Sequence, residues 1–279
     1  MNPLVVSAAQ TCDTLKVAAV QLNSAADWPS NQKKLDHWLA EAARQGVELL
    51  LLPEFFTQIG ASLTARLQTA EVEGEGPIQA YLADQARRLG IWLVAGSLAL
   101  KSDQADKTTN TCLVYDPSGR QVARYDKIHL FGFQKNGERY DESETFVAGQ
   151  QPVCFDLPWG RVGLGICYDL RFPELFRQLP SLDLLLLPAA FTVTTGQAHW
   201  SLLLRARAVE NQCYVLAAAQ VGEHADGRRT WGHSQVIDAW GEVQVCLDEG
   251  EGLVIQTLSQ QHLQAVRDSL PAMQHRRLD

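Results

Sequence analysis

Short, almost uninterrupted apolar runs alternate along this chain with segments whose apolar residues recur every three or four positions. The runs LKVAAVQL at residues 15–22 and VELLLLPEFF at residues 47–56 predict two buried strands. Helical spacing between these two runs predicts a helix over about residues 31–45. The positions with that spacing are Leu35, Trp38, Leu39 and Ala42. The chain therefore begins as strand, helix and strand.

The same alternation continues through the first half of the chain. Pro77 opens a second predicted helix, which closes before Gly90. The run IWLVAGSLAL at residues 91–100 predicts a third strand. A hairpin follows over residues 111–127, with its turn at residues 116–119, Asp-Pro-Ser-Gly.

The second half of the chain repeats this order of elements. DLLLLPAAF at residues 183–191 closely resembles ELLLLPEFF at residues 48–56, and GRVGLGIC at residues 160–167 stands where LKVAAVQL stood before. A helix over residues 197–212 then leads to a strand and a second hairpin, at residues 213–220 and 233–247. Two equivalent halves are the pattern of an internal repeat.

Strands this apolar cannot face water, so each predicted sheet needs helices over it. Two equivalent halves packed sheet against sheet give an α/β fold, a four-layer α-β-β-α sandwich; one doubly wound sheet is the alternative. No linker rich in Pro, Gly or Ser separates the halves, which favours a single domain over residues 1–279. Residues 1–13 read as an N-terminal extension, and a tail with a short helix follows from about residue 260.

Charge and cysteine content narrow the class of partner. The chain of 279 residues has a net charge of −8, so the basic surface that nucleic acid or an anionic membrane requires is missing, and a small-molecule partner is favoured. Six cysteines without a CxxC pair argue against a disulfide scaffold or a zinc ribbon, and the histidines lack HExxH spacing. No leader-like or long apolar segment is visible, so we expect a cytoplasmic protein.

Three polar residues follow predicted strands, where ligands collect in strand-helix folds. They are Glu54, Cys167 and Lys127. A helix that starts just after Cys167 would favour a thiolate and an oxyanion there. Taken singly, each residue also has a purely structural interpretation. Glu54 is then a carboxylate that caps a loop, Cys167 an inert buried thiol and Lys127 a surface lysine. Together they suit nucleophilic attack on an acyl carbon. GRVGLG lacks the glycine order of a dinucleotide-binding loop.

In order and spacing, the motifs LLLLPEFF, YDKIHLF and GLGICYDLRFPEL resemble those of the nitrilase superfamily of carbon-nitrogen hydrolases. That resemblance implies the four-layer sandwich and assigns Glu54, Lys127 and Cys167 as the catalytic residues. It also marks Glu142, in DESETFVAG, as the acid that positions the lysine, and the backbone N–H of Tyr168 as an oxyanion donor. It implies no metal and no organic cofactor.

The residues after the cysteine distinguish branches of the superfamily. True nitrilases commonly carry Trp-Glu there, whereas YDLRFPE and the later segments PAAFTVTTGQAHW and WGHSQVIDAWG resemble the branch that acts on deaminated glutathione. A neighbouring branch, the ω-amidases, acts on α-ketoglutaramate. Both substrates are amides of 2-oxo acids, so we expect Arg171 to bind the oxo-acid carboxylate, with an ion pair to Glu174 as the structural alternative. Phe191, Thr195 and His199 are expected to line the pocket, although His199 could equally pack at a helix start.

The resemblance thus implies a cysteine-dependent amidase that forms a thioester, repairs a metabolite and assembles as a homodimer or larger homo-oligomer. Alternatives from another class are a catalytically silent binding subunit and a redox-sensing thiol protein. The intact set of Glu54, Lys127, Cys167 and Glu142 argues against the silent subunit. The redox sensor would require a reactive thiol without amide turnover.

Overall fold

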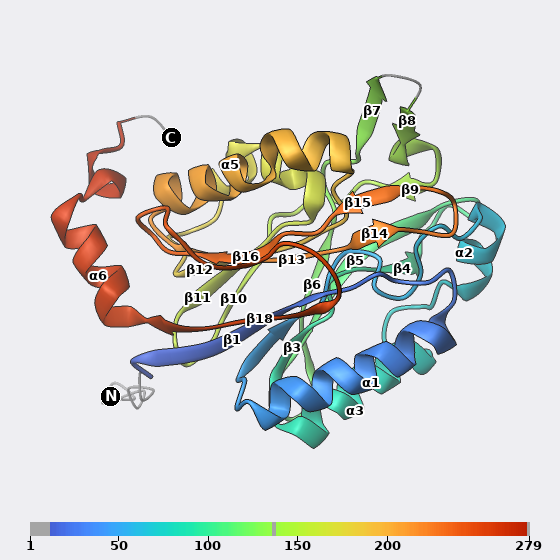
Figure 1. Cartoon of the computed structure of the whole chain (residues 1–279), viewed down its shortest axis with the longest axis horizontal. Coiled ribbons are helices and arrows are strands. Elements are labelled where there is room, and N and C mark those ends of the chain that lie inside the picture. The colour runs from blue at the N-terminus through green and yellow to red at the C-terminus, as the bar shows by residue number, and fades with distance from the viewer. Residues whose placement is uncertain (1–11, 136–137, 278–279) are drawn as a thin grey trace, which may run out of the picture.

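Two β-sheets lie face to face, each with helices on its outer side (Figure 1). The computed structural model describes residues 12–135 and 138–277. One sheet comes mainly from the first half of the chain and the other from the second half. The predicted four-layer sandwich of two equivalent halves is therefore confirmed, and the single doubly wound sheet is excluded.

The first sheet is built from the N-terminal half and one strand of the C-terminal region. Its strands are β1 (Thr14–Gln21), β2 (Leu49–Leu51), β3 (Trp92–Val94), β4 (Leu98–Lys101), β5 (Thr108–Tyr115), β6 (Gln121–Asp126), β9 (Phe146–Val147) and β18 (Gly252–Ser259). Their order is β18-β1-β2-β3-β5-β4, and β6 and β9 also pair with β5. β1, β2 and β3 are parallel, so their carboxyl ends lie at one edge.

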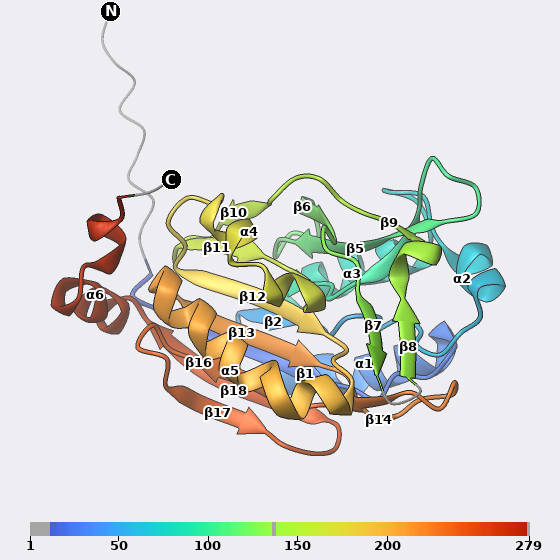
Figure 2. The same cartoon turned by 90° about the horizontal axis from the view of Figure 1, so that it is seen from above.

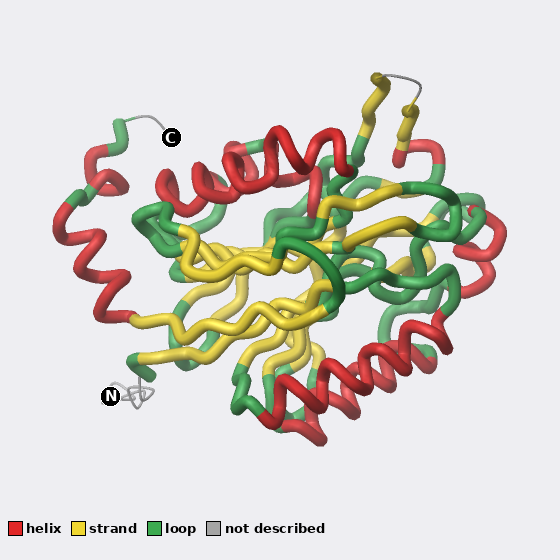
Figure 3. The backbone as a smooth tube through the Cα atoms, viewed as in Figure 1, coloured by secondary structure: helices red, strands yellow, loops and turns green. Residues whose placement is uncertain are grey.

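The second sheet has a similar core of three parallel strands. Its strands are β10 (Cys154–Asp156), β11 (Arg161–Leu164), β12 (Leu184–Ala189), β13 (Tyr214–Ala219), β16 (Ser234–Ile237) and β17 (Val243–Leu247), in that order. Two hairpins stand apart from both sheets: β7 (Gly132–Lys135) with β8 (Glu138–Asp141), and β14 (Val221–Glu223) with β15 (Arg229–Trp231). In the colouring of Figure 3, loops gather at the end of the sandwich from which the β7–β8 hairpin projects.

The helices form the two outer layers (Figure 2). They are α1 (Trp28–Arg44), α2 (Leu63–Thr69), α3 (Pro77–Leu89), α4 (Pro173–Arg177), α5 (Val193–Asn211) and α6 (Gln260–Ser269), with 3-10 turns η1 (Glu142–Glu144), η2 (Cys167–Arg171) and η3 (Ala272–His275). α1 and α3 cover the first sheet and α5 covers the second. Within the described part of the chain, no helix combines the length and the apolar character needed to cross a bilayer.

Burial on both faces explains why the strands lack a polar side. Along β1, Val17 and Ala19 belong to the core between the sheets, whereas Ala18 and Val20 pack in the core beneath α1 and α3. Alternate residues of a strand point to opposite faces, so a strand covered on both sides must be apolar at every position. The near-continuous apolar runs of the sequence follow from this arrangement.

Several element boundaries differ from those expected from the sequence. The run at residues 91–100 forms two strands, because Gly96 takes a left-handed φ of 42° between β3 and β4. α5 starts at Val193 and not at residue 197, with the Thr192 hydroxyl accepting from the backbone N–H of Thr195. No element was predicted for residues 252–259, which form β18.

The two ends of the chain were expected to be an extension and a tail. β1 begins at Thr14, and residues 1–11 of the expected extension lie outside the described residues. The predicted C-terminal helix is α6, whose Leu263 and Val266 are buried against the body of the protein.

Candidate active site

A chain of charged hydrogen bonds lies at the carboxyl edge of the first sheet. Lys127 Nζ donates to Glu54 Oε1 and to Glu142 Oε2, each at 2.8 Å. Glu54 follows the end of β2, Lys127 follows β6, and Glu142 begins η1. Only 1% of the surface of Lys127 or Glu54 is exposed, so these charges must compensate one another. The structure thus brings together three residues separated by up to 88 positions in the chain.

Burial and mutual attraction act in opposite directions on these groups. Burial disfavours the ammonium of Lys127, but the neighbouring Glu142, Glu54 and Cys167 outweigh it and hold the pKa of Lys127 well above its ordinary value. Burial raises the pKa of Glu142, with a further contribution from Glu54. Lys127 therefore remains a cation at neutral pH. Because it also interacts electrostatically with Cys167, a positive charge faces the thiol.

Two neighbours that the sequence analysis did not single out hold Glu54 in place. Asn110 Nδ2 donates to Glu54 Oε1 at 2.9 Å, and Gln220 Nε2 donates to the Glu54 backbone oxygen at 2.9 Å. Asn110 lies on β5, while Gln220 follows β13 in the other half of the chain. Both amides are fully buried. An uncharged, buried polar residue inside a strand gives no sequence signal of its partner, which is why neither residue was predicted.

Cys167 begins η2, with a backbone φ of 51°. A non-glycine residue in this left-handed region is strained, and such strain is common where a side chain must be aimed at a site. Burial and the carboxylate of Glu54 raise the pKa of the Cys167 thiol well above its ordinary value, although Lys127 opposes them. The expectation that the turn alone favours a thiolate is corrected here, because burial and two carboxylates outweigh a short 3-10 turn.

Asp169, also missed from the sequence, fixes the backbone around Cys167. Its carboxylate accepts hydrogen bonds from the Tyr125 hydroxyl at 2.7 Å and from the backbone N–H of Ile166 at 2.9 Å. It also accepts from the backbone N–H of His129 at 3.0 Å. A fully buried carboxylate with several donors is held rigidly, so Asp169 ties the η2 turn to the segment that carries Lys127.

A small cavity opens directly over Cys167. Its lining residues are Phe131, Cys167, Tyr168, Arg171, Ala190, Phe191, Thr192 and Thr195, around an empty space of about 210 Å³. Three of the four predicted substrate-binding residues, Arg171, Phe191 and Thr195, are therefore on its wall. Tyr168 follows Cys167 in the same turn, where its backbone N–H was predicted to act.

The fourth predicted binding residue, His199, lies outside this lining. It is exposed on α5, and its Nδ1 lies 3.3 Å from the NH1 atom of Arg171. The guanidinium of Arg171 also lies over the rings of Tyr168 and Phe191, 5.6 Å and 5.4 Å from their centroids. The alternative of an ion pair with Glu174 finds no support, because among the described residues no carboxylate lies within ion-pair distance of Arg171.

The other cysteines differ from Cys167 in their surroundings. The described cysteines are all free thiols, in agreement with the expected absence of a disulfide scaffold. Burial raises the pKa of Cys112, and it raises the pKa of Cys213 to about 12. Both are fully buried and lie in the hydrophobic core, as expected for structural thiols.

Comparison with known proteins gives one family and several close relatives. The family described as carbon-nitrogen hydrolase matches residues 16–268. The deaminated glutathione amidase of Yersinia enterocolitica is 38% identical over 94% of this chain and 92% of its own length.

Solved structures agree with the family match. The Caenorhabditis elegans NitFhit protein superposes with a TM-score of 0.88 at 36% identity, covering 96% of this chain and 66% of that longer chain. Saccharomyces cerevisiae Nit3, a member of branch 10 of the nitrilase superfamily, gives a TM-score of 0.85 at 29% identity, covering 96% of this chain and 98% of the yeast chain.

Proposed function

This chain belongs to the carbon-nitrogen hydrolase family and is an amide-hydrolysing enzyme, and from that premise we propose that it cleaves deaminated glutathione with Cys167 as the nucleophile. The proposed reaction passes through a thioester and needs no cofactor. The 2-oxo acid is released as a free carboxylate, and cysteinylglycine is the leaving amine.

The observation that carries the proposal is the buried Glu54–Lys127–Glu142 chain beside a protonated thiol. Because the pKa of Cys167 is raised, the nucleophile requires a base when substrate arrives. Glu54 is the carboxylate with the largest electrostatic effect on that thiol. The hydrogen bonds that Glu54 accepts from Lys127 and Asn110 fix the orientation of its carboxylate, as a general base requires.

In the proposed first stage, Glu54 takes the proton of Cys167 as the sulfur attacks the amide carbon. The electron pair of the C=O bond moves onto oxygen, where the Lys127 ammonium and the Tyr168 backbone N–H stabilise the negative charge. Glu54 then returns the proton to the amide nitrogen, the C–N bond breaks, and the amine leaves. A thioester on Cys167 remains.

In the second stage, a water molecule loses a proton to Glu54 and attacks the thioester carbon. The C–S bond breaks, the sulfur recovers the proton from Glu54, and the new carboxylic acid departs and loses its own proton to solvent. Glu142 does not touch the reacting atoms in this scheme. It balances the charge of Lys127 and so holds the ammonium in place.

The choice between the two candidate substrates rests on the relatives and on the cavity. The curated relative from Yersinia enterocolitica is named for deaminated glutathione, which favours that substrate over α-ketoglutaramate. Arg171 supports either, because its guanidinium has no carboxylate partner among the described residues and lines the cavity over Cys167.

The test is product release from deaminated glutathione and from α-ketoglutaramate, measured side by side with the wild type and Cys167→Ala. We expect preferential cleavage of deaminated glutathione and loss of at least about 1,000-fold in kcat for the variant, since the nucleophile is removed. Preference for α-ketoglutaramate would establish the ω-amidase alternative. A fully active alanine variant would refute the thioester mechanism.

We further propose a cytoplasmic enzyme that repairs a transamination side product and works as a homodimer or larger homo-oligomer. Free cysteines favour a reducing compartment. Exposed apolar side chains on and near α5, at Leu202, Val209 and Trp240, favour a contact with a second copy. Light scattering of the purified protein tests the assembly; a monomer at all concentrations would contradict it.

A further inference from the structure

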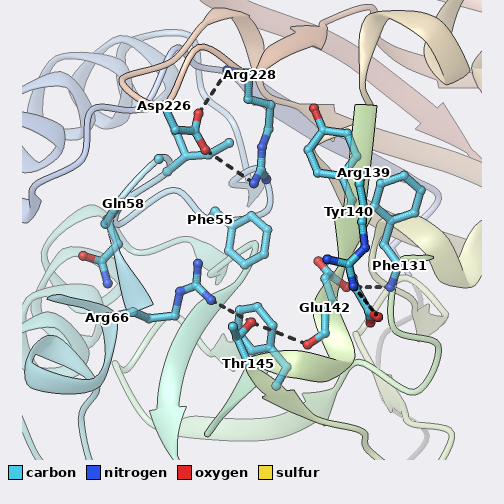
Figure 4. A pocket seen from close by; sticks show the side chains of 15 residues that line it. Phe55, Gln58, Arg66, Phe131, Arg139, Tyr140, Glu142, Thr145, Asp226 and Arg228 are labelled. Carbon is cyan, nitrogen blue, oxygen red and sulfur yellow. Dashed lines mark hydrogen bonds and ion pairs between the residues drawn. The ribbon is translucent and has the colours of Figure 1, made fainter. Parts of the chain in front are cut away.

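A second, larger cavity adjoins the site and has no role in the scheme above (Figure 4). It is open to solvent and comprises about 730 Å³ of empty space between the loop after β2, helix α2, the β8–η1 segment and the β14–β15 turn. We name it the arginine chamber, after Arg66, Arg139 and Arg228 on its wall. These elements come from both halves of the chain, so the chamber exists only in the folded protein.

The chamber and the cavity over Cys167 share a wall. Phe131 lines both of them, and Glu142 lines the chamber while accepting the hydrogen bond from Lys127. The backbone N–H of Phe131 donates to Glu142 Oε2 at 2.8 Å, which fixes this wall to the catalytic charges. A substrate attacked by Cys167 therefore has the chamber beside it.

Arg66 is a cation in the chamber without a carboxylate partner. Its NH1 atom donates to the Thr145 hydroxyl at 3.1 Å, and its guanidinium lies 4.5 Å from the centroid of the Phe146 ring. Among the described residues, no carboxylate lies within ion-pair distance of it. Burial and the nearby charge of Arg228 lower the pKa of Arg66. A half-buried guanidinium beside a second one is an arrangement that a bound anion would stabilise.

Arg228 offers a second set of donors. Its guanidinium lies 3.5 Å from the Asp226 carboxylate and 5.1 Å from the centroid of the Tyr140 ring, and its backbone N–H donates to that carboxylate at 3.1 Å. Its Nε atom is buried and has no hydrogen-bond partner within the described part of the chain. Buried donors without partners are rare in proteins, and they mark places where a ligand completes the hydrogen bonding. In the view of Figure 4, the ring of Phe55 lies between Arg66 and Arg228, which both line the chamber.

The other charged side chains of the chamber have partners of their own. Glu142 pairs with Lys127, and Arg139 pairs with Glu144 at 2.7 Å. Asp141 accepts a hydrogen bond from the Ser143 hydroxyl at 2.5 Å, which closes its own turn. Once these pairs are set aside, Arg66 is left without a carboxylate partner among the described residues, and the guanidinium of Arg228 has only its 3.5 Å contact with Asp226.

We propose that the arginine chamber is the subsite for the leaving amine, where Arg66 and Arg228 bind a carboxylate at the far end of a peptide-like leaving group. This subsite rests on the proposed function and extends that function by naming a class of substrate. That class comprises 2-oxo acid amides whose nitrogen belongs to an amino acid or dipeptide with a free carboxylate. Cysteinylglycine, the leaving group of deaminated glutathione, fits this class, whereas ammonia from α-ketoglutaramate does not.

The two cavities give the two ends of such a substrate separate cations. Arg171 lies on the wall of the cavity over Cys167, where the acyl portion must sit to be attacked. Arg66 and Arg228 line the chamber, which shares Phe131 with that cavity. A substrate with a carboxylate at each end can therefore be held at both, with its amide between them.

The experiment compares kcat/KM of the wild type and Arg66→Gln with deaminated glutathione and with α-ketoglutaramate. A charge-assisted hydrogen bond to a carboxylate typically accounts for about 10- to 100-fold in affinity, so we expect that loss in kcat/KM for deaminated glutathione. Turnover of α-ketoglutaramate should change less than about twofold, since its leaving group never enters the chamber. Arg66→Lys, which keeps the charge, should recover part of the loss.

A substrate analogue separates recognition of the carboxylate from a general effect on structure. Deaminated glutathione with its glycine carboxylate converted to an amide lacks the charge that Arg66 would bind. The kcat/KM of the wild type should fall with this analogue by about the same factor as the kcat/KM of Arg66→Gln falls with deaminated glutathione. Arg66→Gln should have the same kcat/KM with deaminated glutathione and with this analogue, because the contact between the arginine and the carboxylate is already absent in the variant.

Arg120→Gln is the matched control, because it removes the same charge from the exposed turn that joins β5 and β6. This variant should leave kcat/KM unchanged for deaminated glutathione and for α-ketoglutaramate. Equal losses of Arg66→Gln on both substrates, or full wild-type activity with the neutral analogue, would overturn the subsite while leaving the amidase function intact. Absence of any wild-type turnover of deaminated glutathione would instead contradict the proposed function, and the subsite with it.

Discussion

At the scale of single residues, the chemistry depends on the charge states of four ionisable groups, Glu54, Lys127, Glu142 and Cys167. Lys127 stays a cation because two glutamates face it, and Cys167 stays a thiol because burial and Glu54 disfavour its anion. The resting enzyme thus holds a protonated nucleophile beside its base. Such an arrangement protects the sulfur from unwanted oxidation, since the thiolate is the reactive form.

Replacing Glu54 by Gln separates its two effects on Cys167. Amide turnover should fall by at least about 100-fold, because the general base is lost. The pKa of the thiol should fall at the same time, because a carboxylate that raises it is removed while the cation of Lys127 remains. Turnover assays measure the first effect, and ultraviolet absorbance of the thiolate during a pH titration measures the second.

The exposed Glu249→Gln is the control and should change neither quantity. A thiol pKa that rises or stays constant in Glu54→Gln would mean that Glu54 does not act on the sulfur. Unchanged turnover would remove Glu54 from the mechanism.

At the scale of elements, the loop after β2 is positioned by close backbone contact with the β3–β4 junction. A Cβ atom at Gly96 would overlap the carbonyl oxygens of Pro53 and Leu52. Glu54 is the next residue along, and the backbone N–H of Phe55 donates to the Ser97 hydroxyl at 3.1 Å. The break in the predicted strand at residues 91–100 is therefore what lets the catalytic loop lie against it.

Gly96→Ala should lower the free energy of unfolding by about 3 kcal/mol or more, because the clash is with backbone and cannot be relieved by a rotamer change. Activity should fall with it as Glu54 shifts. Gly90→Ala is the matched control: it has a similar left-handed φ but open space around it, so it should cost only about 1 kcal/mol. Urea denaturation measures the free energy of unfolding of both variants. Equal losses of stability would show that the backbone contact at Gly96 is unimportant.

At the scale of the whole molecule, the two halves are joined by a strand and a side chain that each reach from the second half into the first. β18, near the C-terminus, pairs antiparallel with β1 and takes the place in the first sheet that β10 takes beside β11 in the second. Gln220, from the second half, hydrogen-bonds both Ser24 and the backbone of Glu54 in the first. The active site therefore requires both halves in register.

Gln220→Ala should lower the free energy of unfolding by about 2 to 3 kcal/mol, because it leaves buried donors and acceptors of Ser24 and Glu54 without partners. It should also lower kcat more than it raises KM, since Glu54 is displaced while the substrate cavities are untouched. Denaturation and steady-state kinetics measure these effects. The exposed Gln104→Ala should change stability by less than about 0.5 kcal/mol. A Gln220→Ala protein with normal kcat would refute the positioning role.

The sequence by itself determined the layers, the repeat and the residues at the ends of the strands. Apolar runs and helical spacing are local properties of the chain, so they predicted the elements that carry Glu54, Lys127 and Cys167. Glu142 came only from the family resemblance, because its surroundings in the sequence are those of a solvated loop. β18 was not predicted, since five of its eight residues are at least partly exposed and its partner strand is more than 200 residues away.

Only the tertiary structure decided which of these groups meet. The pairing of Lys127 with both glutamates, the anchoring by Asp169 and Gln220, and the grouping of Arg66 with Arg228 all join segments distant in the chain. Such contacts depend on how the two sheets stack and on where the loops between strands return. No local pattern encodes that, because a buried amide or an arginine in a loop looks the same in sequence whatever partner it finds.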